Sequence, residues 1–529
     1  MATEAIKTQA DPGAGARAAD EVILTEMFGD SPRAASAEAD MDAEVTRIAR
    51  EFLGATHVST DVELKWLMES CSETRLPEGV ADTGAYVKHL ADIVEHSTHT
   101  SSPRFIGHMT SALPYFVRPL GKLMTALNQN VVKMETARAL SLYERQALAM
   151  IHRLVYGGPD DFYAHHVQRN GSTLGIVLSG GTLANVTALW CARNAALGPA
   201  PGFHGVERAG LRAALDFYGY DDAVVVGSAL MHYSIGKAVG LLGLGADNLV
   251  QVPVGGDNRV EPEALREAVE DCRARRRLVL AVVGVAGTTD SGAIDPLHRL
   301  SEIARGHRIH FHVDAAWGGP LLFSSRHRQR LAGIELADSV TIDGHKQLYA
   351  PMGIGMLILR DPHTAKAIEK HARYIVRPNS IDLGKRALEG SRPGVALFVH
   401  ASLNILGRRG YEILVDRGIA RTHYMAGAVR ARPEFELLVE PQLNILVYRY
   451  VPARWRAQTA ARALGEHENQ EISRVNERLQ KAQRQRGLSF VSRTTLDTTA
   501  YGRGVAVAAL RAVLANPLTS ESDIDAVLD

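Results

Sequence analysis

The chain has 529 residues, with 59 basic and 59 acidic side chains, so its formal net charge is zero. Its 46% of hydrophobic and 22% of charged residues are typical of a folded protein, and its length predicts more than one domain. A balanced chain has no overall field for nucleic acid or an anionic membrane, so we expect neither as a partner.

Residues 1–40 are rich in small and acidic residues with little periodicity, and we expect a disordered lead-in. They lack the apolar core of a signal peptide, and no apolar run approaches the ~20 residues that span a bilayer. The chain's three cysteines are too widely spaced for a disulfide framework or a metal-ligand pair. These observations predict a cytoplasmic protein.

Two helical regions follow this lead-in. Residues 41–95 carry apolar side chains at helical spacing, and a second helical stretch runs to about residue 155. An irregular stretch at residues 101–114 lies between them. We expect residues 41–150 to form an N-terminal helical segment.

The middle of the chain alternates between helices and short apolar strands. A helix is predicted at residues 182–197, because apolar residues recur at helical spacing until Gly198-Pro199. Strands buried on both faces and separated by helices indicate an α/β fold with a mostly parallel sheet. The expected strands are residues 223–226, 249–252, 279–285, 309–313, 339–342 and 354–359, and further helices are expected at residues 262–276 and 296–306.

The composition changes after about residue 410. Residues 453–485 form a charged helical run, and residues 504–514 have the pattern of a strand. We therefore expect a large domain over residues 151–410 and a small C-terminal α+β domain over residues 411–529.

Two charged residues follow neighbouring predicted strands, at the edge where such sheets bind ligands. Asp314 closes an apolar strand, so its carboxylate needs a cationic partner, and Lys346 follows the next strand. One interpretation is a structural Asp–Lys pair. The other is that the Lys346 amine binds the aldehyde of pyridoxal 5′-phosphate (PLP), while Asp314 keeps the pyridine ring protonated as an electron sink.

The segment Ser179-Gly-Gly-Thr-Leu-Ala-Asn185 opens the helix predicted at residues 182–197. Glycines let the backbone approach an anion, and the first turn of a helix offers free N–H groups and positive dipole potential. The same residues also suit an ordinary turn and helix cap. Together with a cofactor-binding lysine, Gly180, Gly181 and Thr182 are predicted to bind a phosphate.

Several histidines are candidates for chemistry. His232 follows another predicted strand and is either a structural histidine or a cofactor contact. His307, His310 and His312 suggest a metal, but His310 and His312 share one face of a strand, and no carboxylate joins them at ligand spacing. We therefore predict no metal site.

These residues lie in blocks that resemble the group II PLP-dependent decarboxylases. The strongest blocks are His312-Val-Asp-Ala-Ala-Trp-Gly-Gly319, Ala337-Asp-Ser-Val-Thr-Ile-Asp-Gly-His-Lys-Gln-Leu348 and Leu388-Glu-Gly-Ser-Arg-Pro-Gly394. The resemblance runs from about residue 101 to the C-terminus. It implies the type I, aspartate-aminotransferase-like fold of PLP-dependent transferases, and a homodimer with the active site at the subunit interface, where residues 41–150 would pack.

Within this family the chain is similar to the bacterial PLP-dependent aspartate 1-decarboxylases, on three further blocks at residues 103–116, 123–130 and 283–289. This similarity implies α-decarboxylation of a small acidic amino acid, best matched by L-aspartate giving β-alanine and CO2. The alternatives are L-glutamate, diaminobutyrate or another amino acid as substrate, a carbon–carbon lyase of the same fold, and a non-catalytic PLP-binding protein.

The resemblance also implies residue roles. Lys346 would bind the cofactor as a Schiff base, Asp314 would pair with its ring nitrogen, and His232 would stack on its ring. These three are the expected catalytic residues. The other expected cofactor contacts are Thr289 at the phenolic oxygen, and Gly180, Gly181, Thr182 and His345 at the phosphate.

Two residues are implied to bind the substrate. Arg511 resembles the anchor of the α-carboxylate, for which a guanidinium fork suits better than an ammonium. His108 stands where related glutamate decarboxylases have an amide near the distal carboxylate. Many family members donate the final proton from a tyrosine on a loop, but residues 375–391 contain no tyrosine and Tyr374 precedes them. Lys346, His232 or a tyrosine thus remain the proton donors to test.

Overall fold

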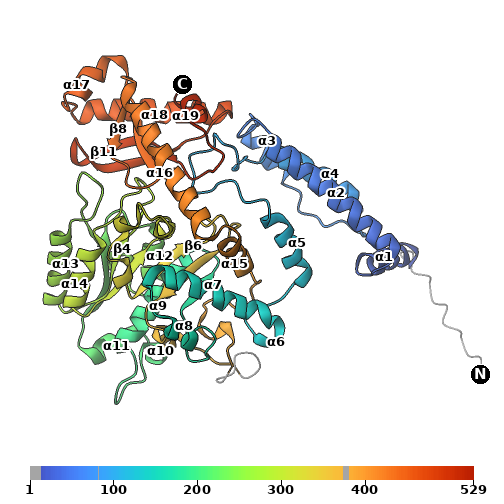
Figure 1. Cartoon of the computed structure of the whole chain (residues 1–529), viewed down its shortest axis with the longest axis horizontal. Coiled ribbons are helices and arrows are strands. Elements are labelled where there is room, and N and C mark those ends of the chain that lie inside the picture. The colour runs from blue at the N-terminus through green and yellow to red at the C-terminus, as the bar shows by residue number, and fades with distance from the viewer. Residues whose placement is uncertain (1–13, 82, 373–379) are drawn as a thin grey trace, which may run out of the picture. The chain divides into compact units, whose positions relative to one another are not determined.

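The structure is a computed structural model that describes residues 14–81, 83–372 and 380–529. The chain divides into two compact units, one formed by residues 1–102 with 482–490 and the other by residues 103–481 with 491–529 (Figure 1). Within the described residues, no helix is both long and apolar enough to cross a membrane.

The first unit is helical in its described part. Helix α2 (Pro32–Gly54) begins where the Ser31 side chain accepts a hydrogen bond from the Ala34 N–H and proline occupies the first turn, two features that favour a helix start. The disordered lead-in expected for residues 1–40 therefore differs from the structure over residues 14–27 and 32–40, which are helical. The other helices are α1 (Ala14–Met27), α3 (Leu64–Ser70) and α4 (Thr83–Glu95), and α4 packs against α2.

The second unit contains the large sheet. Within its described residues, seven strands lie in the order β1-β7-β6-β5-β4-β2-β3. Neighbours from β6 to β3 are parallel, and β7 is antiparallel to both β1 and β6, so β7 alone runs in the opposite direction. The α/β fold with a mostly parallel sheet is thus confirmed. The strands are β1 (Gly175–Leu178), β2 (Asp222–Ser228), β3 (Leu249–Val252), β4 (Arg277–Val285), β5 (His310–Asp314), β6 (Ser339–Asp343) and β7 (Gly355–Leu359).

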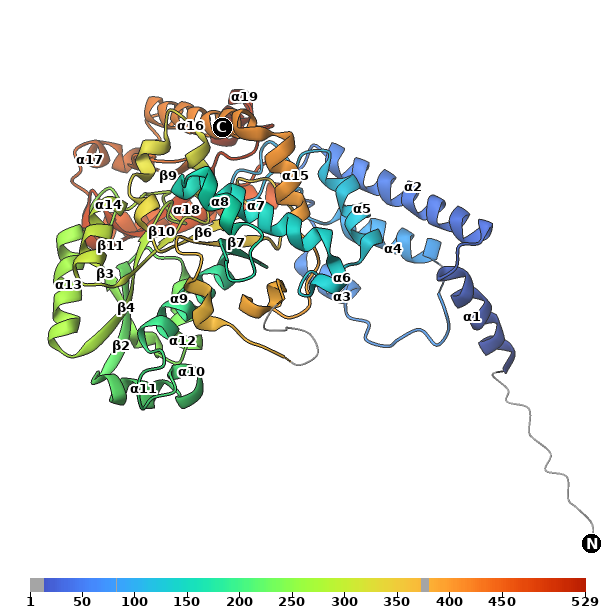
Figure 2. The same ribbon diagram turned by 60° about the horizontal axis from the view of Figure 1, so that its bottom comes forward.

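Helices cover both faces of this sheet, as Figures 1 and 2 show. Side chains of successive strand residues point to opposite faces, so β2 contributes Val224 and Val226 to one core and Val225 to the other. The first core includes α7 (Ala139–Tyr156), α13 (Pro262–Ala274) and α14 (Leu297–Gly306). The second includes α9 (Gly181–Ala196), α11 (Leu211–Tyr218) and α12 (Tyr233–Leu241).

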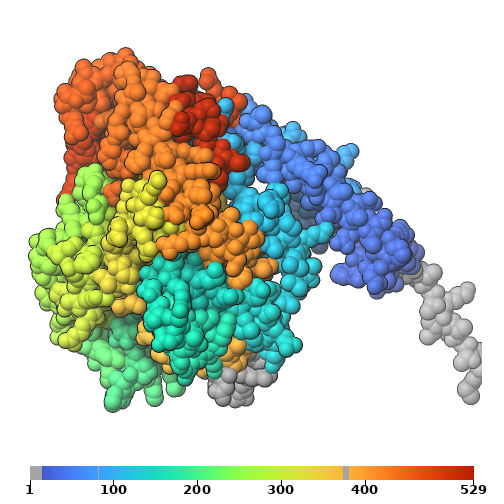
Figure 3. All heavy atoms as spheres, in the orientation of Figure 1, coloured from blue at the N-terminus to red at the C-terminus, as the bar shows by residue number. Residues whose placement is uncertain are grey.

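A second sheet lies in the C-terminal part of the same unit. In the described part of the chain its order is β10-β11-β9-β8, and all its pairs are antiparallel. Figure 3 shows this orange and red region packed directly on the green and yellow region of the large sheet. The strands are β8 (Phe435–Val439), β9 (Ile445–Tyr450), β10 (Ser492–Thr499) and β11 (Gly502–Val513).

Most elements expected from the sequence are present within a few residues of their predicted bounds. The charged run at residues 453–485 is not one helix but two, because Arg462 adopts a left-handed φ of 52° and the chain turns before Glu466. The four-domain division stays a prediction. The remaining α-helices are α5 (Val117–Leu127), α6 (Met134–Ala137), α8 (Asp160–His166), α10 (Val206–Ala209), α15 (Ala396–Ile405), α16 (Gly407–Ala431), α17 (Arg456–Ala460), α18 (Glu466–Arg486) and α19 (Glu521–Leu528).

A buried histidine on α7 predicts how stability depends on pH. His152 is 2% exposed, and burial lowers the pKa of its imidazole from 6.5 to about 4. Between these two pH values the imidazole is protonated in the unfolded chain but not in the folded chain. The free energy of unfolding therefore falls as the pH drops from about 6.5 towards 4, by roughly 3 kcal/mol for this group. In urea unfolding at about pH 7 and about pH 5, His152→Gln should show a smaller loss of stability than wild type. The exposed His298→Gln variant is the control, and equal losses in all three proteins would contradict the assignment.

Candidate active site

A cavity of about 540 Å³ lies at the edge of the large sheet where the parallel strands end. Its volume is in the range of pockets that hold cofactors and small ligands. β1, β4, β5 and β6 all direct their carboxyl ends to this edge. Every residue that the sequence analysis proposed for the site lines this one cavity: His108, Gly180, Gly181, Thr182, His232, Thr289, Asp314, His345, Lys346 and Arg511.

Lys346 lies just beyond β6 and is held by an acidic neighbour. Its Nζ is 3.0 Å from Oδ2 of Asp343, the last residue of β6, and His345 Nε2 is 3.7 Å from the same oxygen. Asp343 is 2% exposed, and its Oδ1 has no hydrogen-bond partner within the described residues. The sequence analysis missed Asp343, although its position three residues before Lys346 at a strand end was a usable signal.

The glycines after β1 bring the start of α9 close to the neighbouring strand. Gly180 has a φ of 150°, which side chains disfavour, and a Cβ on Gly355 of β7 would lie 2.3 Å from the Gly180 backbone. A Cβ on Gly181 would lie 2.9 Å from the Asp343 carboxylate. Gly180 and Gly181 therefore line the cavity without a side chain at the start of α9, where the free N–H groups of a first helical turn fit a phosphate.

Asp314, at the end of β5, is a buried carboxylate that accepts hydrogen bonds from two donors. Asn185 Nδ2 donates to its Oδ2 at 2.9 Å, and the Ala316 N–H donates to its Oδ1 at 3.2 Å. The side chain lines the cavity but the residue is only 6% exposed. A carboxylate in this setting fits a cationic ring nitrogen of a ligand, because a buried charge needs a partner.

His232 caps the N-terminus of α12. Its Nδ1 accepts a hydrogen bond from the Ser234 N–H at 3.3 Å and is 2.8 Å from the Ser234 hydroxyl. Burial lowers the pKa of His232, and Asp314 opposes that shift. The imidazole is therefore favoured in its neutral form, as a flat ring at the wall of the cavity.

Arg511 reaches the cavity from β11 of the small sheet. Its Nε donates to the Thr289 carbonyl at 2.6 Å, and its Nη1 donates to the Gly107 carbonyl at 3.2 Å and the Ser492 hydroxyl at 3.0 Å. Its Nη2 is buried and has no partner among the described residues. Burial lowers the pKa of the guanidinium to about 10, which leaves it charged at neutral pH. The two N–H donors of Nη2 on this fixed cation are thus left for an anionic ligand.

His108 faces the same cavity from the segment before α5. Burial lowers the pKa of its imidazole, and the positive charge of Arg511 lowers it further, followed by Lys346 and His345. These side chains share one cavity although Arg511 and the neighbouring Gly107 are 404 residues apart in the chain. Only the fold brings them together.

Comparison with known proteins identifies this arrangement. The pyridoxal-dependent decarboxylase conserved domain matches residues 75–451. The chain belongs to this family. The aspartate 1-decarboxylase of Aliivibrio fischeri is 44% identical over 92% of this chain and 90% of its own length. The L-2,4-diaminobutyrate decarboxylase of Rhizobium meliloti is 32% identical over 72% of this chain and 71% of its own.

The fold of the family is also that of this chain. The crystal structure of mouse CSAD has a TM-score of 0.82, with 26% identity over 94% of this chain and 98% of the other. The group II PLP-dependent decarboxylase assignment and the type I fold are therefore confirmed, and the protein is a PLP-dependent amino-acid decarboxylase. The interpretation of a non-catalytic binding protein loses its support.

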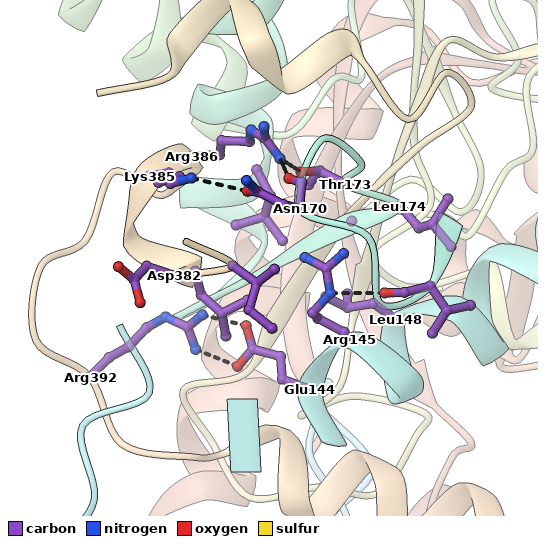
Figure 4. Close-up of a pocket in the computed structure, with 15 residues that line it drawn as sticks. Glu144, Arg145, Leu148, Asn170, Thr173, Leu174, Asp382, Lys385, Arg386 and Arg392 are labelled. Carbon is purple, nitrogen blue, oxygen red and sulfur yellow. Dashed lines mark hydrogen bonds and ion pairs between the residues drawn. The ribbon is translucent and has the colours of Figure 1, made fainter. Parts of the chain in front are cut away.

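A second, smaller cavity of about 30 Å³ has a structural role in this decarboxylase (Figure 4). There the Arg392 guanidinium binds both oxygens of Glu144, and Arg145 Nε donates to the Val167 carbonyl at 2.8 Å. Lys385 Nζ donates to the Asn170 side chain at 3.0 Å. The Arg392–Glu144 pair ties the chain at residue 392 to α7, and the Lys385–Asn170 bond ties residue 385 to the segment after α8. The cavity is too small for PLP.

Many family members carry the proton-donating tyrosine on a loop, and of the matching residues 375–391, which contain no tyrosine, the structure describes residues 380–391. Tyr374 lies outside the described residues. Besides Asp343, the sequence analysis missed Asn185 and Ser234, which contact Asp314 and His232. Asn185 was visible in the quoted glycine segment but had no assigned role, because a hydrogen bond to a residue 129 positions away leaves no sequence pattern.

Proposed function

We propose that this enzyme decarboxylates L-aspartate to β-alanine and CO2. The observation that carries the proposal is the pairing of two basic groups, Arg511 and His108, in the cavity that holds Lys346. A substrate with two carboxylates can engage both groups. The 44% identity to a protein named aspartate 1-decarboxylase points to the same substrate.

In this proposal the free Nη2 of Arg511 binds the α-carboxylate, and His108 binds the carboxylate of the side chain. The guanidinium is already fixed by Thr289, Gly107 and Ser492, so little conformational entropy is lost on binding. The positive charges of Arg511 and Lys346 act on His108 and would repel the distal ammonium of diaminobutyrate. An acidic side chain suits the site better than a basic one.

The remaining residues of the cavity are assigned to the cofactor in this proposal. The start of α9 at Gly180, Gly181 and Thr182 would bind the phosphate together with His345, and Asp314 would pair with the ring nitrogen. His232 would lie against the ring face, Thr289 would contact the phenolic oxygen, and the Lys346 amine would hold the aldehyde carbon. When bound, PLP supplies an electron sink for the pair left on Cα as CO2 departs.

A proton must then reach Cα. Lys346 and His232 both line the cavity, and Asp343 keeps the Lys346 amine in position through its 3.0 Å contact. Lys346 as an ammonium can deliver the proton within the cavity, and His232 can do so when its imidazole is protonated.

We also propose a homodimer in the cytoplasm. Large apolar side chains are exposed on two helices of the N-terminal half, at Trp66 and Met68 of α3 and at Leu123 and Leu127 of α5. Exposed apolar faces of this kind favour association with a second copy. Sedimentation equilibrium should give twice the mass of the chain, and a monomer under assay conditions would contradict the proposal.

A substrate panel tests the proposed function. Aspartate, glutamate, cysteine sulfinate and diaminobutyrate are offered to the purified enzyme, and CO2 and amine are measured. Aspartate should have the highest kcat/KM. His108→Gln should lower the ratio of kcat/KM for aspartate to that for glutamate by about ten- to a hundredfold. This factor corresponds to the free energy of one hydrogen bond to a charged group. Arg511→Lys is the matched control, since it should raise KM for every substrate without changing their order.

Preference for another amino acid would overturn the aspartate assignment. Release of amine without CO2, or cleavage of a different Cα bond, would instead favour the carbon–carbon lyase.

A further inference from the structure

A chain of buried hydrogen bonds runs from the interior of the sheet to the cavity. His310 Nε2 is 2.7 Å from the Ser339 hydroxyl, and the same hydroxyl is 2.8 Å from His312 Nδ1. His312 Nε2 is 3.0 Å from Oδ1 of Asn185. Asn185 Nδ2 then bonds to Asp314 Oδ2. Asn185, His312 and Ser339 are each at most 1% exposed, so solvent does not compete for these bonds.

The Asn185 amide has two N–H bonds on one nitrogen, and both are used. They point to Asp314 Oδ2 and to the Ser234 hydroxyl, each at 2.9 Å. The reversed amide would set its carbonyl oxygen against the Asp314 carboxylate, which repels it, so the charge of Asp314 fixes the orientation. Asn185 Oδ1 must then accept from His312 Nε2–H.

The orientation of Asn185 also sets which atoms donate in the hydrogen bonds among His312, Ser339 and His310. His312 is neutral, because burial lowers the pKa of its imidazole to about 4. With its proton on Nε2, its Nδ1 accepts from the Ser339 O–H. The Ser339 oxygen in turn accepts from His310 Nε2–H. The chain therefore supports the Asp314 carboxylate without adding a second charge.

The second N–H of Asn185 is linked to His232 through the Ser234 hydroxyl. Because the Ser234 oxygen accepts from Asn185, its own O–H is free to donate to His232 Nδ1, 2.8 Å away. The Ser234 backbone N–H points to the same nitrogen. Two donors on Nδ1 leave the proton of the neutral His232 on Nε2.

We propose that Asn185 is a positioning residue whose single amide both anchors the Asp314 carboxylate and sets His232 in the tautomer with its proton on Nε2. The inference rests on the proposed roles of Asp314 and His232. It makes the Nε2–H of His232 a hydrogen-bond donor on the side where the cofactor ring would lie. It also links that face to the ring-nitrogen end through one side chain of α9, the helix whose first turn forms the phosphate cradle.

The charged groups around His232 come from three elements. Asp314 ends β5, Asp343 and Lys346 lie at the end of β6, and Lys237 follows on α12. The two carboxylates favour a protonated His232 and the two lysines oppose it. The Ser234 hydroxyl and N–H reinforce the neutral form, because both require a lone pair on Nδ1. Loss of these donors should therefore move the titration of His232 to higher pH.

Three variants of the PLP-loaded enzyme separate the two functions of the amide. Asn185→Ala should weaken PLP binding at least about tenfold and move the acid limb of the kcat/KM profile up by about one pH unit. Ser234→Ala should move only the acid limb. Asn194→Ala is the matched control, because this buried amide of the same helix bonds to Glu207 and the Ala367 carbonyl, and it should change neither.

A direct reading of the tautomer needs no substrate. In ¹⁵N NMR of histidine-labelled holoenzyme, with His232 assigned by its loss in His232→Gln, Nε2 should carry the proton in wild type, and Asn185→Ala should show a mixture. A proton on Nδ1 in wild type, or identical PLP affinity and pH profile in Asn185→Ala and Asn194→Ala, would overturn the inference. A wrong substrate assignment would leave the NMR and PLP affinity results unchanged, so the two failures are distinguishable.

Discussion

Replacing Lys346 by alanine is expected to abolish the covalent attachment of PLP and to lower kcat by at least about a thousandfold, the scale of a positioned proton-transfer group. The Lys346 amine lines the cavity and is held against a carboxylate, with Nζ 3.0 Å from Asp343 Oδ2. Loss of the amine removes both the bond to the cofactor and a proton carrier beside Cα. Absorbance near visible wavelengths and mass spectrometry of borohydride-reduced protein measure the attachment.

Lys237→Ala supplies the matched control for this experiment. Lys237 lies on α12 next to the site, with its Nζ 4.6 Å from the centre of the Tyr233 ring, and it does not line the cavity. Its loss should leave the covalent tag and turnover near wild type. A borohydride tag on a peptide other than the one carrying Lys346 would contradict the assignment, and retention of the tag in Lys346→Ala would do the same.

The large sheet could be predicted because its strands are buried on both faces and read as apolar runs. β4, β5 and β6 are of this kind. β10 was missed because its sequence is rich in threonine and only two of its eight residues are buried, so it has no apolar run. β1 has only four residues, too few for periodicity to separate a strand from a loop.

Some residues of the candidate site could likewise be predicted from the sequence pattern, and others could not. Asp314 and Lys346 each follow a strand of the parallel sheet, so the rule that ligands bind at strand ends already placed them together. Arg511 and His108 were found only through the family resemblance, because no local pattern links β11 to the segment before α5. The partners Asn185 and Asp343 act through geometry that depends on packing. Their roles follow from distances and burial, which a single sequence does not contain.

Asp314→Asn should keep the covalent bond to PLP but lower kcat/KM by at least about a thousandfold, or ~4 kcal/mol of transition-state stabilisation. The amide has nearly the shape of the carboxylate and its oxygen can still accept from Asn185 or Ala316. However, it has no negative charge to keep a ring nitrogen protonated, and an unprotonated ring is a poor electron sink. Kinetics with the best substrate of the panel, together with the absorbance of the bound cofactor, measure the two effects separately.

Asp338→Asn is the control for this change, since it removes a carboxylate from the same sheet away from the cavity. Asp338 precedes β6, accepts from the Phe311 N–H at 2.9 Å and pairs with Arg360. This variant should lower the stability of the fold but leave kcat/KM nearly unchanged, because Asp338 does not line the cavity. If Asp314→Asn turned over like wild type, the charge at this position would have no part in catalysis. The charge of Asp314 also fixes the orientation of the Asn185 amide. In Asp314→Asn this amide should therefore be able to flip, and His232 should populate both neutral tautomers.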